Sequence, residues 1–380
     1  MPAHAVNFVT RRSSRISAIG FAAMVLVFFV HTNNLRVNFR DHSVITGSPA
    51  VRFIENALSC GIASAAVPWF FVVSGFLFFY DAPERGTAEM SWFNGKLRRR
   101  LQSLVVPYLI WSSFYFGVLT LLKMPAEATH FFKSGDIDFS PTAVLQRVFV
   151  DPVPYQLWFV RDLIVYTLLS PLILAVVRRA GLWWLAALAL LWVGRTNLVV
   201  VSPEGLLFFC AGCWMAINPA SIRYLESDRL AGNRRGLLWC GLWIGLALAV
   251  GVCGTLWDPL PPLVRELDVL AGLMALWFGF PVWGQPIRPL LLRLAPYTFF
   301  LYVAHEPILT IFKKLAFASL EPAPSTHLIA YFGAPAVTAV VLLCVGSLLR
   351  DRLPRWYGVL TGWRGVRLEE PQRLQRASIS

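Results

Sequence analysis

Long apolar runs separated by short polar segments dominate the chain. A run of about 20 apolar residues is long enough for a helix to cross the hydrocarbon core of a bilayer. Such runs are predicted at 15–31, 57–80, 101–122, 156–177, 182–201, 204–217, 236–256, 263–284, 293–312 and 328–349. The pattern therefore predicts an all-α fold, a polytopic membrane bundle of about 10 transmembrane helices.

The polar segments between the runs are too short for a soluble domain. We expect one transmembrane domain at 1–350, followed by a basic cytoplasmic tail at 351–380. Arg11 and Arg12 precede the first run, as in a twin-arginine signal, but no small-residue cleavage site follows. The first run is therefore interpreted as a retained membrane helix.

The composition indicates a membrane protein, and in a membrane protein the positive net charge reports topology. The chain is 57% hydrophobic and 14% charged, whereas a soluble domain carries roughly a quarter charged residues. The net charge of +13 could suit nucleic acid. With the N-terminus inside, however, most Lys and Arg residues fall in cytoplasmic segments, as the positive-inside rule requires. We therefore predict cytoplasmic N- and C-termini and no nucleic-acid partner.

The cysteines offer no clear chemistry. All six lie in apolar runs, where small packing residues are common. Cys210 and Cys213 form a CxxC pair, but no thioredoxin-like pattern of strands and helices surrounds them. We predict neither a metal site nor a permanently bound cofactor.

Two histidines in apolar runs are the strongest candidates for chemistry. Ionisable residues within a bilayer are costly and are commonly retained for catalysis or transport. At about 1.5 Å per residue, His31 lies about 24 Å from Arg15, and His305 lies about 18 Å from Arg293. Arg161, in an inward-running helix, lies about 23 Å above the inner boundary. The three side chains are thus predicted to share a depth in the outer half of the membrane.

Helical spacing adds neighbours to this set. Trp158 shares a helix face with Arg161, and Tyr302 shares one with His305. Histidine can take a proton from a hydroxyl, and arginine can stabilise an oxyanion. Glu306 follows His305 directly and is expected to point elsewhere. The candidate catalytic residues are His31, His305 and Arg161, and the candidate substrate-binding residues are Trp158, Trp69, Tyr302 and Ser74.

Each catalytic candidate also has a structural interpretation, which the sequence leaves open. His31 could face lipid headgroups, and His305 could bond to a neighbouring helix. Arg161 could form an ion pair with Asp162, the next residue.

Five motifs, in order, resemble those of the acyltransferase-3 family of bacterial integral-membrane O-acyltransferases. They are the apolar stretch 22–31 ending in His31, V-P-W-F-F-V-V-S-G-F at 67–76, K-L-R-R-R-L at 96–101 followed by Pro107, Tyr108 and Trp111, L-W-F-V-R-D-L at 157–163, and Y-V-A-H at 302–305. The second is similar to the family pattern P-x-F-F-x-x-S-G-F. The resemblance covers most of the chain.

The resemblance implies an enzyme and its substrates. Such enzymes move an acyl group, usually acetyl, from cytoplasmic acyl-CoA to a sugar hydroxyl outside the cytoplasm. The implied protein is a multi-pass O-acyltransferase of the bacterial cytoplasmic (inner) membrane, without a fused extracytoplasmic domain. Its acceptor would be a glycan or glycolipid, such as an exopolysaccharide or lipopolysaccharide. The acceptor, the choice between acetyl and succinyl, and the oligomeric state are left open.

Residue roles follow from the same resemblance. His31 would be the general base on the acceptor hydroxyl, and His305 would orient substrate or relay the proton. Arg161 would steady the thioester oxygen or a carboxylate on the glycan. The phosphates of CoA would meet the basic residues Lys96, Arg98, Arg99 and Arg100, and the pantetheine arm would pass Ser74.

One position departs from the family pattern. The family usually carries an arginine eleven residues before the first-helix histidine, and Gly20 occupies that position here. Arg15 is the nearest arginine, more than a turn further inward. If the family arginine holds the donor, this chain must use another group.

A transporter or flippase for a glycan intermediate or small molecule is the alternative function. Polar residues at depth and proline-kinked helices would suit it. The chain shows no internal repeat, however, and two related halves are common in secondary transporters. A membrane scaffold is a third class, in which the buried His and Arg residues would tolerate replacement by alanine.

Overall fold

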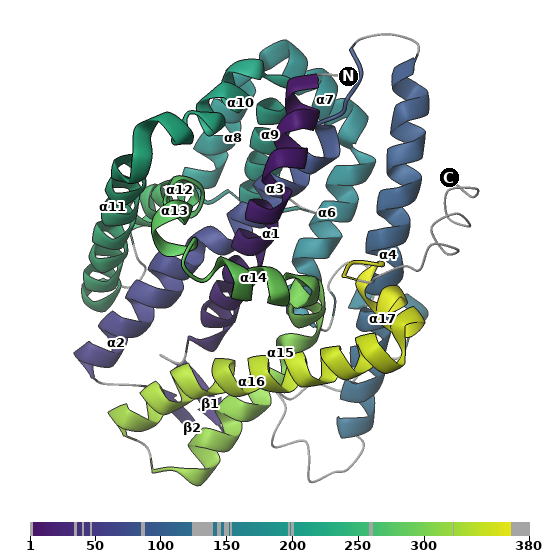
Figure 1. Cartoon of the computed structure of the whole chain (residues 1–380). Coiled ribbons are helices and arrows are strands. Elements are labelled where there is room, and N and C mark those ends of the chain that lie inside the picture. Colours follow the sequence, from purple (N-terminus) through teal and green to yellow (C-terminus); the bar gives the residue numbers. More distant parts are fainter. Residues whose placement is uncertain are drawn as a thin grey trace.

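The protein is a helical bundle with one small hairpin (Figure 1). The computed structural model describes residues 3–33, 36–39, 42–45, 48–84, 88–123, 140–142, 146–147, 152, 154–196, 198, 201–257, 261–321 and 323–365. The predicted all-α class is confirmed in its essentials, because the described strands are β1 (Arg36–Phe39) and β2 (His42–Ile45), one antiparallel pair after the first helix.

The first half of the chain supplies two central helices, α1 and α3 (Figure 1). Its helices are α1 (Ala3–Thr32), α2 (Pro49–Glu55), α3 (Ala66–Phe79), α4 (Ala88–Lys123), α6 (Trp158–Leu168), α7 (Ser170–Ala180) and α8 (Leu182–Val193). Short non-α turns join some of them: a π-helix η1 (Asn56–Gly61), and 3-10 turns η2 (Ile62–Ala65) and η5 (Tyr155–Leu157).

The second half supplies α9, which packs on α3 in the centre, and the helices at the left and lower edges in Figure 1. Its helices are α9 (Pro203–Ile217), α10 (Pro219–Glu226), α11 (Asp228–Leu256), α12 (Pro262–Phe278), α13 (Phe280–Trp283), α14 (Arg288–Leu294), α15 (Thr298–Ser319), α16 (Pro324–Arg352) and α17 (Pro354–Thr361), with a 3-10 turn η6 (Ala295–Tyr297) before α15. In Figure 1, α11 and α4 lie at opposite edges of the molecule, and α16 crosses the lower part steeply inclined to α4.

The predicted count of ten spans is not confirmed. Within the described residues, five helical stretches are long and apolar enough to cross a bilayer: Arg12–Thr32, Pro49–Phe79, Glu89–Val118, Asn233–Leu256 and Pro324–Arg352. Two bent pairs raise the number to seven if each is one span: α6 with α7, bent by 71°, and α9 with α10, bent by 92°. The predicted span 182–201 shrinks to the short helix α8.

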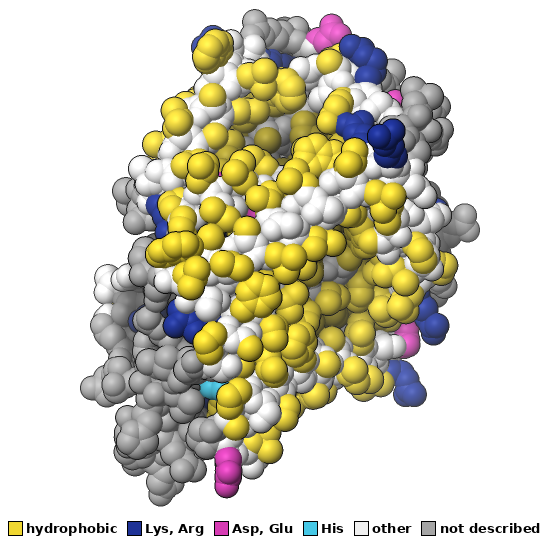
Figure 2. Space-filling view, turned by 90° about the vertical axis from the view of Figure 1, so that its left-hand side faces the viewer, with side chains coloured by type: hydrophobic (Ala, Val, Ile, Leu, Met, Phe, Trp, Pro, Cys, Tyr) yellow, Lys and Arg dark blue, Asp and Glu magenta, His cyan; other side chains and the backbone are white. Residues whose placement is uncertain are grey.

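The surface of the outer helices is apolar. Figure 2 shows the side of the molecule that lies on the left in Figure 1, and hydrophobic side chains cover it broadly, with the charged side chains mostly near its margins. On α11, Leu238 is 67% exposed, and on α16, Val340 is 62% exposed. A contiguous apolar surface of this extent marks contact with lipid or protein. Together with the apolar helices, it makes the chain a multi-pass membrane protein.

Helices α3 and α9 pack backbone to backbone in the centre. A Cβ atom at Gly75 would collide with the carbonyl oxygen of Phe209, and one at Gly212 would collide with that of Val72. Small residues allow membrane helices to approach this closely. The two residues of the Ser74-Gly75 pair therefore have different roles: Gly75 packs against α9, and Ser74 lines a cavity.

Helix α15 breaks in its middle. Glu306 has φ −98° and ψ 138°, which are values of extended backbone. Pro307 follows and has no N–H to give the carbonyl of Val303, its helical acceptor. Gln156 Nε2 and the Tyr115 hydroxyl each lie 3.4 Å from that carbonyl oxygen and donate to it. Helix α4 and the turn η5 are thus tied to α15 at its break.

Candidate active site

The structure brings the two candidate histidines together. His31 lies in the last turn of α1, and His305 lies just before the break in α15. Their ring centroids are 5.1 Å apart, with 35° between the ring planes. His305 is fully buried beside Phe28, whereas His31 is half-buried. His31 and His305 therefore lie close together, as the positions along their helices predict.

Tyr155 joins His31 to a carboxylate. The Tyr155 hydroxyl lies 3.1 Å from Nδ1 of His31 and donates to Oε1 of Glu306 at 3.0 Å. Tyr155 is 50% exposed, so this edge of the site is accessible from outside the protein. In a regular helix Glu306, the neighbour of His305, would point away from the site. The break in the backbone at Glu306 takes its side chain off the regular helical positions and brings it within reach of Tyr155.

These contacts fix the tautomers of both histidines. A hydroxyl that donates its proton to Glu306 can only accept from His31, so Nδ1 of His31 carries the hydrogen and Nε2 has a free lone pair. His305 Nδ1 lies 2.7 Å from the carbonyl oxygen of Tyr302, which can only accept. Its buried Nε2 therefore also has a free lone pair, and it has no hydrogen-bond partner among the described residues. In its neutral form, each ring therefore presents an unprotonated Nε2 that can accept a proton.

A lysine that the sequence analysis missed holds the end of α1. Lys313 Nζ donates to the carbonyl oxygens of His31 at 3.2 Å and Asn33 at 3.4 Å. The last carbonyls of a helix lack helical partners, and a cation there also complements the helix dipole. Lys313 therefore positions the backbone of His31. Its signal in the sequence was a lysine pair inside an apolar run, which resembles an ordinary helix end.

Arg161 forms the predicted ion pair. Its Nη2 and Nε lie 2.9 and 3.1 Å from Oδ1 of Asp162. The other oxygen of Asp162 accepts from the backbone N–H of Ser202 at 2.9 Å. The ion pair matches the structural interpretation of Arg161, and the contact with Ser202 shows in addition that Asp162 fastens α6 to the start of α9. A catalytic role for Arg161 stays a prediction.

The two tryptophan candidates differ in accessibility. Trp69 is 5% exposed and stacks on Trp277 at a centroid distance of 6.3 Å, so it offers little surface to a sugar. Trp158 is half-buried, with its ring 5.9 Å from that of Phe71. Of the two, Trp158 has more surface for a ligand.

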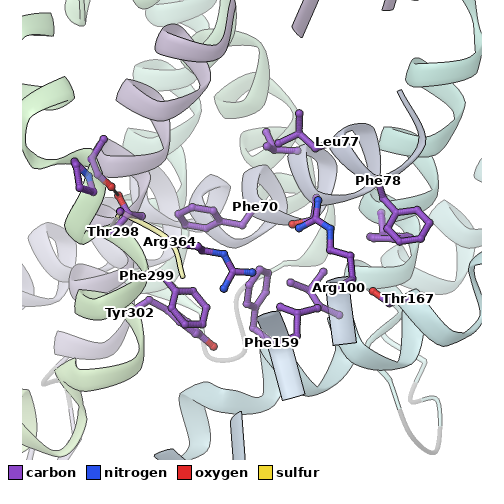
Figure 3. Close-up of a pocket in the computed structure, with 18 residues that line it drawn as sticks. Phe70, Leu77, Phe78, Arg100, Phe159, Thr167, Thr298, Phe299, Tyr302 and Arg364 are labelled. Atoms are coloured by element: carbon purple, nitrogen blue, oxygen red, sulfur yellow. Dashed lines mark hydrogen bonds between the residues drawn. The ribbon is translucent and has the colours of Figure 1, made fainter. Parts of the chain in front are cut away.

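A cavity of about 260 Å³ adjoins the histidines. It lies between α3, α4, α6, α9, α15 and the segment after α17, and Figure 3 shows the side chains that enter it. Three predicted residues line it, namely Ser74, Arg100 and Tyr302. Tyr302 precedes His305 by one helical turn, and their ring centroids are 6.3 Å apart. The cavity thus ends one aromatic ring away from the histidine pair.

The predicted phosphate cluster separates into members with different surroundings. Lys96 forms an ion pair with Asp81 at 2.6 Å, and Arg98 and Arg99 are exposed. Arg100 is the one that lines the cavity. A regular helix explains this, because consecutive residues point in different directions and cannot all face one site.

Arg364 is a second arginine in the cavity. In the sequence analysis it was part of the basic tail at 351–380. In the structure, its guanidinium lies over the ring of Phe299 at 4.3 Å and donates to the carbonyl oxygen of Ser103 at 3.0 Å. Burial, and to a lesser degree the neighbouring charge of Arg100, lower the pKa of Arg364 to about 9. The remainder of the predicted tail, 366–380, lies outside the described residues.

Gly20, which stands where the family usually has an arginine, has open space beside it. A Cβ atom at Gly20 would touch only the Phe70 ring, at 4.0 Å, among the described residues, and Phe70 lines the cavity. Arg15 does not take the place of the missing arginine, because its guanidinium is engaged with Trp277. Its guanidinium donates to the carbonyl oxygen of Trp277 and lies over that ring at 4.3 Å.

Comparisons with known proteins agree with these features. The family model described as an acyltransferase domain, acyltransferase-3, matches residues 19–349. A relative from Rhizobium meliloti (strain 1021), named succinoglycan biosynthesis protein ExoH, is 27% identical over 316 residues, which cover 78% of this chain and 79% of the relative. No solved structure matches the chain. The five motifs, the family match and the paired histidines lead to one conclusion: this chain belongs to the acyltransferase-3 family of membrane acyltransferases.

Proposed function

We propose that this protein is an O-acyltransferase that moves an acyl group from acyl-CoA to a hydroxyl of a bacterial glycan. The observation that carries the proposal is the hydrogen-bonded chain His31–Tyr155–Glu306, which leaves Nε2 of His31 free to accept a proton. The relative named for succinoglycan biosynthesis favours an exopolysaccharide as acceptor. Acetyl is the first acyl group to test, with succinyl as the second.

His31 acts as the general base in the proposed reaction. Its Nε2 takes the proton of the acceptor hydroxyl while the hydroxyl oxygen attacks the carbonyl carbon of the thioester. The C–O ester bond forms, the C–S bond breaks, and the imidazolium returns the proton to the departing thiolate of CoA. Glu306 stabilises the transient positive charge through Tyr155, as the carboxylate of a catalytic triad does.

His305 orients the reactants. Its lone pair at Nε2 is buried and unpaired among the described residues, and a buried acceptor without a donor costs free energy. A hydroxyl or amide N–H of a substrate would satisfy it. The pantetheine arm of CoA carries amide N–H groups and would reach this point from the cavity lined by Ser74, Arg100 and Tyr302.

Orientation in the membrane follows from the same proposal. The basic residues at the start of α4 would face the cytoplasm, where acyl-CoA is made, and both chain termini would lie on that side. His31, at the other end of α1, would meet an acceptor on the outer side of the cytoplasmic membrane.

Mass spectrometry of surface glycans tests the proposal in cells. Cells that lack the gene should lose an ester-sized mass from one glycan, and the wild-type gene should restore it. The gene carrying His31→Ala should not restore it, although the variant reaches the membrane in normal amount. Normal acylation by that variant would remove His31 from the mechanism. Unchanged glycans in all strains, together with glycolipid binding by the purified protein, would favour a transporter.

A further inference from the structure

We propose that the cavity beside α15 is a binding site for a phosphate ester, which Arg100 and Arg364 hold from two sides. The segment after α16 would thereby complete a ligand site. The inference deepens the proposed function and rests on it in one respect, namely that a CoA thioester would supply the phosphate.

The lining of the cavity is cationic without a compensating acid. Arg100 and Arg364 are its charged lining residues, and no Asp or Glu lines it within the described chain. Figure 3 shows the two guanidinium groups entering the space from opposite sides. Two cations that face one cavity repel each other and have lost part of their hydration. The charge of Asp81 also acts on Arg100, but Asp81 is already paired with Lys96 at 2.6 Å. An anion between the two guanidinium groups would relieve both costs.

Both arginines have donors to spare. Arg364 uses Nη1 for the carbonyl oxygens of Ser103 and Thr361, at 3.0 and 3.2 Å, and its remaining N–H groups have no partner among the described residues. Arg100 has no hydrogen-bond acceptor at its guanidinium within the described part of the chain. A guanidinium has five N–H donors in a planar fork that matches phosphate oxygens. The pair therefore suits phosphate better than a single negative charge.

The segment that carries Arg364 is firmly placed. Trp111 Nε1 donates to the carbonyl oxygen of Leu360 at 3.0 Å, and the Tyr357 hydroxyl donates to that of Pro296 at 3.1 Å. These contacts fasten α17 to α4 and to the start of α15. The segment that presents Arg364 is therefore fixed to two elements that line the cavity, α4 and the turn before α15.

Two glycines let this segment lie directly on its neighbours. Gly362 has φ +61° and Gly365 has φ +74°, in the left-handed region that favours glycine. A Cβ atom at Gly362 would collide with the carbonyl oxygen of Ser103, and one at Gly365 with that of Pro296. The turn that presents Arg364 therefore needs glycine on both sides of it.

The rest of the cavity indicates what the phosphate is attached to. Beyond the arginines the lining is largely apolar, with Phe70, Leu77, Phe159 and Phe299 among its members. Its volume of about 260 Å³ is below the range of pockets that enclose a whole drug-sized ligand. The site thus fits a phosphate at the arginines and a narrow, uncharged arm inside.

Two sources could supply a ligand of this chemistry, a CoA thioester or an anionic phospholipid. The test uses the full-length protein in nanodiscs of phosphatidylcholine and measures CoA binding by calorimetry. We expect Arg364→Gln to weaken the affinity for CoA at least tenfold. Arg355→Gln, which removes an exposed arginine from α17, is the matched control and should bind as the wild type does. Arg364→Lys keeps the charge, loses the fork, and should fall between the two.

A second arm separates the two sources. Phosphatidylglycerol is added to the nanodiscs, and its retention on the purified protein is measured by native mass spectrometry. If the wild type retains phosphatidylglycerol but does not bind CoA, and Arg364→Gln abolishes the retention, the phosphate site is kept but its ligand is a lipid. That result would also count against acyl-CoA as the donor. Equal binding of both probes by wild type and Arg364→Gln would overturn the site. If Arg364→Gln fails to fold, wild-type binding by Arg364→Lys would overturn the bidentate contact.

Discussion

At the scale of single residues, the site depends on one hydroxyl proton. The Tyr155 hydroxyl donates its proton to Glu306 and therefore accepts from Nδ1 of His31. In the neutral ring this leaves Nε2 of His31 unprotonated. A histidine in the other tautomer would present N–H to the acceptor hydroxyl and could not act as its base. The tyrosine is therefore a positioning residue for the proposed reaction.

Replacing Tyr155 by Phe tests this role. The ring is kept, but His31 loses the acceptor for its Nδ1–H and both tautomers become accessible. We expect kcat to fall at least about tenfold, while KM for the acceptor changes little. A tenfold loss is the lower end of the loss of activity seen when a histidine loses the group that orients it. Steady-state kinetics of acyl transfer measures both constants. Tyr224→Phe, on α10 and 49% exposed, is the control and should leave them unchanged. Equal kcat values for Tyr155→Phe and wild type would show that the hydroxyl does not position His31.

At the scale of the elements, the close contact of α3 and α9 holds the cavity wall in place. Ser74 and Phe209 line the cavity from these two helices, next to the point where Gly75 meets Phe209. Any side chain at Gly75 must move one helix away from the other. Local packing of glycine is thus connected to the shape of the ligand site.

Gly75→Ala should destabilise the protein by about 1–3 kcal/mol, because the added methyl group overpacks a rigid backbone contact. The temperature of half-loss of the soluble monomer in detergent measures this effect. Gly245→Ala on α11 is the matched control, because a Cβ there meets nothing within 4 Å among the described residues. It should leave the protein unchanged or slightly more stable. Equal temperatures for the two variants would contradict the close approach of α3 to α9.

The elements also show why some predictions from sequence succeeded and others did not. Helical rise predicted that His31 and His305 meet, because α1 and the first part of α15 are regular helices. The same reasoning missed Glu306, since a break in the backbone changes where the next side chain points. Pro307 was the available signal, because a proline removes a helical hydrogen bond and can break the helix.

The difference in span count has a similar cause. Hydropathy reports how apolar a segment is, and carries no information on a bend within it. Helices α6 and α7 form one apolar run but differ in direction by 71°. Arg364 was missed for the opposite reason: its neighbours in sequence are polar and basic, so composition predicted a solvated tail, while tertiary packing against Ser103 buries it.

At the scale of the whole molecule, the bundle places two chemically different sites next to each other. One is a cavity with Arg100 and Arg364, and the other is the partly accessible histidine site with Tyr155 at its edge. Tyr302 belongs to both, because it lines the cavity and accepts the Nδ1 hydrogen of His305 at its carbonyl oxygen. In the proposed function, this arrangement lets a donor and an acceptor meet within the membrane without sharing an entrance.

The most direct test of the central claim is CoA release by purified protein in nanodiscs, supplied with acetyl-CoA or succinyl-CoA and a hydroxyl-bearing glycan. The wild type should release CoA only when both substrates are present. His31→Ala should bind CoA as the wild type does but release it at least about 100-fold more slowly, the lower end of general-base contributions. Release by His31→Ala at the wild-type rate would show that His31 is not the general base.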